Sequence, residues 1–204
     1  MSFHPRMAYD ATFHKSTRDR GASDADAPPF IYTPENRARF DRIVTRYPAD
    51  QRRSAVLPAL YLVQYQQGYI TPSAMRHVAE LLGITPADVE DVVSFYTMFY
   101  TRPVGAFVLQ VCRTLSCALN GAERVVEELA AKLGIEPGQT DPTRTFTLLE
   151  VECLGACDRA PVVMVNGSWH ECLKPEDAAR LVDDLKARGE AALTGCHLAV
   201  ERKS

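Results

Sequence analysis

Four paired cysteines limit what this chain can fold into more than any other feature. Cys112 and Cys117 are separated by four residues, Cys153 and Cys157 by three, and 35 residues lie between the two pairs. Each pair follows a run of apolar and β-branched residues, at positions 107–111 and 145–151. We therefore expect both pairs in loops at strand ends, where thiolates from two loops can meet. Four thiolates are the ligand set of a [2Fe–2S] cluster, and we predict one such cluster on these residues.

Two other interpretations of the four cysteines remain open from spacing alone. Structural zinc is also held by four thiolates, although its sites commonly use C-x2-C arms, and neither pair has that spacing. Dithiol–disulfide chemistry of the thioredoxin type needs C-x-x-C at a helix N-terminus, and the chain contains no C-x-x-C. The spacing favours iron–sulfur over both alternatives.

Composition narrows the class of protein. The chain has 204 residues, is 46% hydrophobic and carries a formal net charge of −3, which gives no electrostatic footprint for nucleic acid or for a membrane surface. No apolar run approaches the length of a membrane span, so we expect contact with a membrane only through partner proteins. All six cysteines lie in the second half and no signal peptide precedes them, which favours a reducing cytoplasm over a disulfide framework.

The first half predicts a small helical bundle over residues 30–100, after a polar arm at 1–29 that we expect to be disordered. Three Thr-Pro pairs, at 33–34, 71–72 and 85–86, have the form of helix starts, with threonine at the N-cap and proline in the first turn. Apolar residues then recur at helical spacing, and Gly68 and Gly83 are placed to end two of the helices. Short links between four such helices are typical of an antiparallel bundle.

The second half predicts a thioredoxin-like domain over residues 101–189, followed by a tail at 190–204. The expected elements are strands at 106–111, 145–151, 161–165 and 169–173 and helices at 120–133 and 175–188. Asn166-Gly167 is a hairpin signal between the last two strands. The order βαβ then ββα is that of a thioredoxin-like fold, so the fold class is α/β (α+β), a helical bundle followed by a [2Fe–2S] domain.

Residues beside the cysteines suit a cluster. Ser116, Gly155 and Ala156 allow close approach of the backbone, and we expect Leu115 and Leu154 to shield the metal from water. Arg113 and Arg159 either raise its reduction potential or are solvated surface charges.

Two further cysteines and two histidines lie outside this set. We expect Cys172 to be a buried, inert thiol in a strand and Cys196 to be an exposed free thiol. His170 and His197 are expected to be surface or partly buried histidines and not ligands.

Several motifs together resemble a known family. They are Cys112-x4-Cys117 with Leu119-x-Gly121, the phrases at 150–157 (EVECLGAC) and 160–166 (APVVMVN), and SFYTMF at 94–99. Over about residues 30–188 the chain is similar to the small [2Fe–2S] subunit of respiratory complex I, the NADH:quinone oxidoreductase. That small subunit is also known as the 24 kDa subunit.

The resemblance implies a function. It implies an N-terminal helical bundle, a thioredoxin-like cluster domain and four ligands at Cys112, Cys117, Cys153 and Cys157. It also implies a partner subunit that binds FMN and oxidises NADH, a large iron–sulfur subunit beyond it, and a peripheral place on the cytoplasmic face of the bacterial inner membrane. This chain has no G-x-G-x-x-G segment of its own, so we expect it not to oxidise NADH alone.

Rival functions stay open at this point. Similar subunits serve NAD-linked formate dehydrogenases and NAD-reducing hydrogenases. A zinc-stapled interaction module and a thiol oxidoreductase are the alternatives from other classes.

Overall fold

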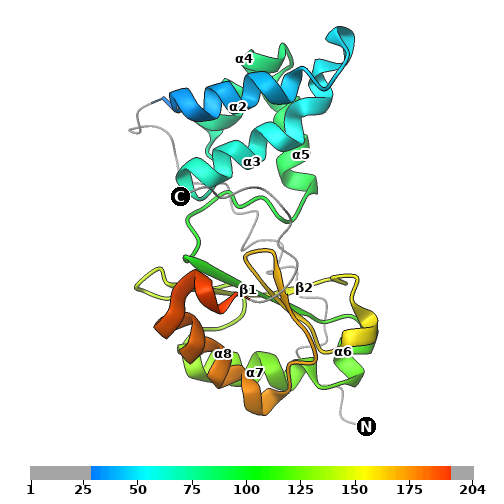
Figure 1. Ribbon diagram of the computed structural model, residues 1–204, viewed down its shortest axis with the longest axis vertical. Helices are drawn as coiled ribbons and strands as arrows, with labels where there is room; N and C mark the ends of the chain where they lie inside the picture. The colour runs from blue at the N-terminus through cyan, green and yellow to red at the C-terminus, as the bar shows by residue number, and fades with distance from the viewer. Residues whose placement is uncertain (1–28, 194–204) are drawn as a thin grey trace. The chain divides into compact units, whose positions relative to one another are not determined.

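The computed structural model describes residues 29–193, which divide into two compact units between Pro103 and Val104 (Figure 1). The expectations for most of the N-terminal arm, for the end of the tail and for Cys196 and His197 fall outside the described residues. None of the described helices is long and apolar enough to cross a membrane. The mixture of helices and one mixed sheet confirms the predicted fold class.

The first unit is helical, and its helices begin where the threonines predict. Its elements are α2 (Pro34–Val44), the 3-10 helix η2 (Ala49–Ala55), α3 (Val56–Gln67), α4 (Pro72–Leu82) and α5 (Pro86–Phe95). The side chains of Thr33, Thr71 and Thr85 each accept a backbone N–H in the first turn of α2, α4 and α5. Gly68 and Gly83 end α3 and α4 in left-handed conformations, as the sequence predicts.

The start of α5 carries a complete capping box, and it allows a first prediction. Thr85 accepts the Asp88 N–H at 3.2 Å, and the Asp88 carboxylate accepts the Thr85 N–H at 2.9 Å. Replacing Thr85 with alanine should lower the free energy of unfolding by about 1 kcal/mol at neutral pH, measured by urea titration. An unchanged midpoint would show that the cap contributes nothing to stability.

The same cap should respond to acid. Hydrogen bonds from the Thr85 hydroxyl and backbone, with Arg53 nearby, hold the pKa of Asp88 below its usual range. A depressed carboxyl pKa adds stability that is present at neutral pH and lost as the pH falls through that pKa. The stability difference between wild type and Thr85→Ala should therefore shrink in acid.

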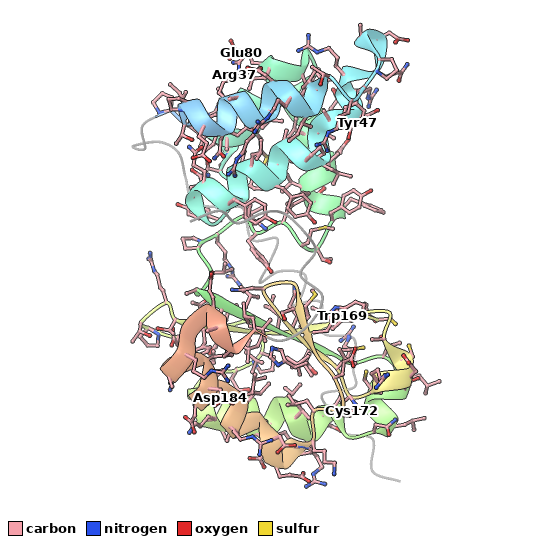
Figure 2. The ribbon with its side chains drawn as sticks, viewed as in Figure 1. Arg37, Tyr47, Glu80, Trp169, Cys172 and Asp184 are labelled. Carbon is pink, nitrogen blue, oxygen red and sulfur yellow. The ribbon has the colours of Figure 1, made fainter. Side chains whose placement is uncertain are left out.

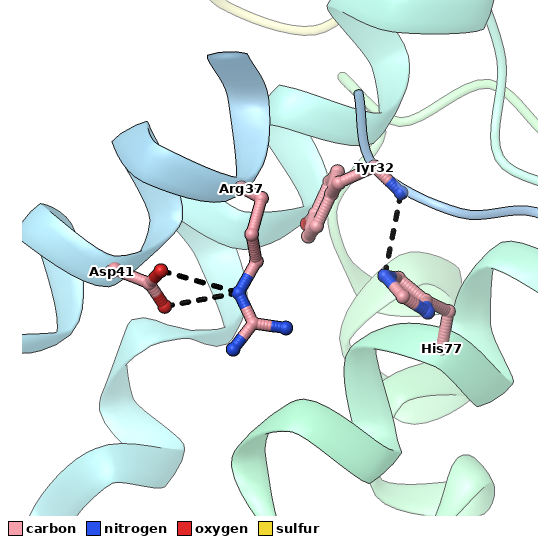
Figure 3. Close-up of polar contacts among 4 residues, drawn as sticks. All are labelled: Tyr32, Arg37, Asp41 and His77. Carbon is pink, nitrogen blue, oxygen red and sulfur yellow. Dashed lines mark hydrogen bonds and ion pairs between the residues drawn. The ribbon is translucent and has the colours of Figure 1, made fainter. Parts of the chain in front are cut away.

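Tyr32 links the segment before α2 to the helices behind it. Its phenol donates to the Ala59 carbonyl at 2.7 Å, and its backbone N–H donates to His77 Nε2 at 3.5 Å (Figure 3). Burial raises the pKa of the Tyr32 phenol and lowers the pKa of His77, so both groups are neutral near pH 7. Arg37, one turn into α2, pairs with Asp41 on the exposed side of that helix. The core of this unit includes the fully buried side chains of Phe40, Leu60 and Val78.

The second unit is a four-stranded sheet in the order β2-β1-β3-β4. The strands are β1 (Phe107–Cys112), β2 (Phe146–Val151), β3 (Val163–Val165) and β4 (Ser168–His170). β1 pairs with β2 in parallel, with Cys112 opposite Val151, and with β3 in antiparallel fashion. Asn166 and Gly167 adopt positive φ between β3 and β4, which confirms the predicted hairpin turn.

Helices α7 (Ala122–Leu133) and α8 (Pro175–Arg188) pack against each other on one face of this sheet (Figure 1). They bury Val125, Leu129 and Leu185 against alternate residues of β1 and β2. Two elements differ from the prediction: a short helix α6 (Leu115–Leu119) precedes α7, where a loop was expected, and the last strand ends at His170 and not at residue 173. Two short 3-10 helices, η3 (Cys157–Arg159) and η4 (Gly189–Ala192), complete the unit.

Candidate metal centre

Because β1 and β2 pair in parallel, both cysteine pairs lie at the same end of the sheet, beside the carboxyl ends of these two strands. Parallel strands have their carboxyl ends on the same side. Cys112 is the last residue of β1, and Cys153 follows two residues after the end of β2. A backbone hydrogen bond joins the ends of β1 and β2: the Arg113 N–H donates to the Val151 carbonyl at 3.0 Å.

The secondary structure around the cysteines is more regular than the sequence predicts. Cys112 lies inside β1, Cys117 lies in α6 and Cys157 begins η3, so only Cys153 lies in a loop. α6 packs against η3, which places Cys117 beside Cys157. The expectation that both pairs occupy loops is therefore wrong for three of the four residues.

The four thiols gather as two pairs. The Cys112 and Cys117 thiols are buried and lie close enough for each to shift the pKa of the other. The Cys153 and Cys157 sulfurs lie 3.6 Å apart and are exposed. The pairs are neighbours, because a charge on Cys112 acts on Cys157 and a charge on Cys157 acts on Cys117. One half of the site thus faces the interior and the other half faces the surface.

The surroundings shift the pKa values of the thiols in different directions. Burial alone would raise the pKa of Cys112, but hydrogen bonds from the backbone of Thr114 and Leu154, and from the Cys117 thiol, lower it. Burial and the bond to Cys112 raise the pKa of Cys117 to about 11. The hydrogen bond with Cys153 and the charge of that thiol raise the pKa of Cys157. Thiols must lose their protons to bind metal, so metal binding here releases protons and should strengthen as the pH rises.

Backbone N–H groups point at the sulfurs. The Gly155 N–H donates to Cys153 Sγ at 3.3 Å, and Gly155 has a φ of +81° that a side chain would strain. The Leu154 N–H reaches Cys112, so the second loop supports a sulfur of the first pair. The Ser116 hydroxyl lies against Cys157. Donors of this kind stabilise thiolate ligands and are expected around a cluster.

The two adjacent pairs of thiols suit two metal ions better than one. A structural zinc needs four ligands around a single ion. A [2Fe–2S] cluster contains two irons, and two adjacent pairs of thiols suit it better. The donor set therefore fits a two-iron cluster.

The charged and apolar neighbours differ in part from expectation. Arg113 pairs with Glu152 at 2.7 Å, and Arg159 lies near Asp158 and Glu171, so both positive charges have acidic partners. Leu154 is partly buried against the core, but Leu115 is 71% exposed and does not shield the thiols. The prediction for Leu115 is wrong because α6 turns that residue outward.

Cys172 also differs from its prediction. It lies in the turn after β4 with a φ of +51°, and it is exposed, not buried in a strand (Figure 2). Its N–H donates to the Arg159 carbonyl at 2.8 Å. β4 ends at His170, two residues before Cys172, which accounts for the exposure. His170 is half-buried, and burial lowers its pKa, so it is neutral near pH 7.

The sequence missed one group. The buried hydroxyl oxygen of Thr114 makes no hydrogen bond of standard geometry within residues 29–193. It lies beside the Cys112 thiol, whose pKa it helps to lower. No short sequence pattern identifies this hydroxyl, because its position depends on the helix α6 that the sequence did not predict.

Known proteins resemble the chain over most of its length. The family model for the thioredoxin-like [2Fe-2S] ferredoxin matches residues 40–186. NADH dehydrogenase [ubiquinone] flavoprotein 2 of Dictyostelium discoideum is 39% identical over 174 residues, which are 85% of this chain and 69% of that protein. A subunit of the NADH-quinone oxidoreductase of Mycobacterium bovis is 41% identical over 166 residues, 79% of this chain. The match spans 65% of the Mycobacterium protein, so the chain covers about two thirds of the length of these relatives.

A solved structure shares the fold. The crystal structure of an NAD+-reducing [NiFe]-hydrogenase matches 70% of this chain and 25% of its own with a TM-score of 0.59, at 18% identity. At that identity the likeness shows the fold alone.

Proposed function

The chain belongs to the thioredoxin-like [2Fe–2S] ferredoxin family, and we propose that it is a one-electron carrier subunit of an NADH:quinone oxidoreductase. The observation that carries the proposal is the meeting of two thiol pairs at the carboxyl ends of β1 and β2. The names of the relatives that match at about 40% identity support the choice of complex.

Cys112, Cys117, Cys153 and Cys157 would hold the cluster. When bound, the cluster supplies transfer of one electron at a time. The chain's own residues hold the thiolates, donate N–H groups to them and keep water from the Cys112–Cys117 side. The exposed Cys153–Cys157 side is where a partner can approach closely.

The proposed partners follow from the family. An FMN-binding, NADH-oxidising subunit would exchange electrons with this chain, and a large iron–sulfur subunit would lie beyond it. The chain would reach the membrane only through that complex, on its cytoplasmic side. Because the hydrogenase shares this fold, the fold alone does not say whether the parent complex is a quinone reductase, a hydrogenase or a formate dehydrogenase. The identity of the neighbouring genes would distinguish these complexes.

The test is a measurement of metal on the full chain purified without oxygen. Iron, acid-labile sulfide and zinc are assayed, and EPR spectra are recorded after dithionite reduction. We expect about two irons and two sulfides per chain and a spectrum of a reduced S = 1/2 cluster. One zinc per chain, with no sulfide and no EPR signal, would overturn the electron-carrier proposal and indicate a zinc-stapled interaction module.

A further inference from the structure

Thr114 occupies the N-cap of α6 without capping it. A threonine hydroxyl at this position ordinarily accepts a backbone N–H from the first turn of the helix. Thr33, Thr71 and Thr85 do so for α2, α4 and α5. The Thr114 side chain makes no such bond, although its backbone has the extended conformation of an N-cap. Its hydroxyl therefore makes no capping hydrogen bond to α6.

The Thr114 hydroxyl is buried beside a proposed ligand. Thr114 Oγ1 is out of contact with solvent and has no hydrogen-bond partner of standard geometry in the described part of the chain. Leaving a buried hydroxyl unbonded costs about 1–3 kcal/mol. The Cys112 thiol, two residues earlier in the sequence and only 2% exposed, lies beside this hydroxyl. A sulfur that becomes a charged ligand would be a much better acceptor than a neutral thiol.

We infer that Thr114 is a positioning residue whose hydroxyl donates a hydrogen bond to the Cys112 thiolate when the cluster is bound, and that this bond raises the reduction potential of the cluster. The inference rests on the proposed function. A cluster gains negative charge when it accepts an electron, so a donor to a ligand sulfur stabilises the reduced state more than the oxidised state. Thr114 acts through Cys112 and is not itself a ligand.

The test compares Thr114→Val, which keeps the shape and removes the hydroxyl, with Thr114→Ser, which keeps the hydroxyl. Thr143→Val is the matched control, because the Thr143 hydroxyl bonds Asp141 and Thr145 at a distance from the cysteines. Full-length proteins are purified without oxygen and titrated with dithionite while the EPR signal is followed.

Loss of the hydroxyl should lower the equilibrium constant for reduction about fivefold, or about 40 mV at 59 mV per tenfold for one electron. Thr114→Ser and Thr143→Val should match the wild type.

A second readout reports the bond directly. Resonance Raman bands of the iron–sulfur stretches should shift between H2O and D2O more in the wild type and Thr114→Ser than in Thr114→Val. If Thr114→Val loads no iron, Thr114→Ala replaces it with the same expectations. Equal potentials and equal isotope shifts in all variants overturn the role of Thr114 alone. A wild type without iron and sulfide overturns the proposed function and this inference together.

Discussion

Replacing Cys112 with alanine should reduce the iron and sulfide that co-purify with the chain at least about tenfold. Replacing a residue that only hydrogen-bonds a metal ligand already lowers metal affinity by about that factor, and loss of a ligand should cost at least as much. Cys112 is buried, contacts Cys117 and receives the N–H of Leu154 from the other loop. Its loss removes one thiolate and the contact between this residue and the Leu154 N–H. Iron and sulfide assays on anaerobically purified protein, with EPR after reduction, measure the effect.

Cys172→Ala is the control for this variant. Cys172 is an exposed thiol in the turn after β4, and its replacement should leave iron, sulfide and the EPR signal unchanged. Full iron content in Cys112→Ala would remove Cys112 from the ligand set. Loss of iron in Cys172→Ala would show that the set includes a thiol assigned here to the surface.

Replacing Gly105 with alanine should destabilise the second unit by roughly 3 kcal/mol, at the upper end of what overpacking costs. A Cβ on Gly105 would lie 2.6–2.8 Å from the backbone C, N and Cα atoms of Phe146, and strand backbone cannot move aside as a side chain can. The Gly105 N–H also donates to Thr147 Oγ1 at 2.7 Å, so any shift breaks a buried bond. Urea titration followed by circular dichroism measures the loss.

Gly134→Ala gives the matched comparison. Gly134 ends α7 at a φ of +68°, and a Cβ there meets no atom within 4 Å. It should cost only about 1 kcal/mol, from backbone strain without a clash. Equal losses in the two variants would mean that the close approach of Gly105 to β2 does not govern stability. Because Gly105 precedes β1 and Phe146 begins β2, Gly105→Ala should also lower iron content, by disturbing the register that brings the cysteine pairs together.

Local signals predicted most of the elements. The Thr-Pro starts, the glycine ends and the Asn-Gly turn depend on a few neighbouring residues, and the structure has them where the sequence places them. α6 escaped prediction because it has five residues and exposes Leu115 and Leu119, 71% and 78% accessible, so it shows no amphipathic pattern. The same helix turned the expected shielding residue outward.

The arrangement of the sulfurs could not be predicted in the same way. Spacing identified the two cysteine pairs, but the meeting of the pairs depends on β1 and β2 lying parallel, which is a contact between distant segments. The orphaned hydroxyl of Thr114 depends on how α6 meets β1, and no short pattern encodes that. The ligand assignment itself stays a prediction that the cysteine variants test.

The parallel pairing of β1 and β2 also sets an order of events during synthesis. Cys112 is made long before Cys157, and α7 with its loops lies between the two strands. Closing so long a segment has an entropic cost that must be met before the distant contacts form. A chain still emerging from the ribosome therefore presents only the Cys112–Cys117 half of the site. Iron delivered at that stage would find one thiol pair, so loading should follow folding of the sheet and should strongly slow its unfolding once complete.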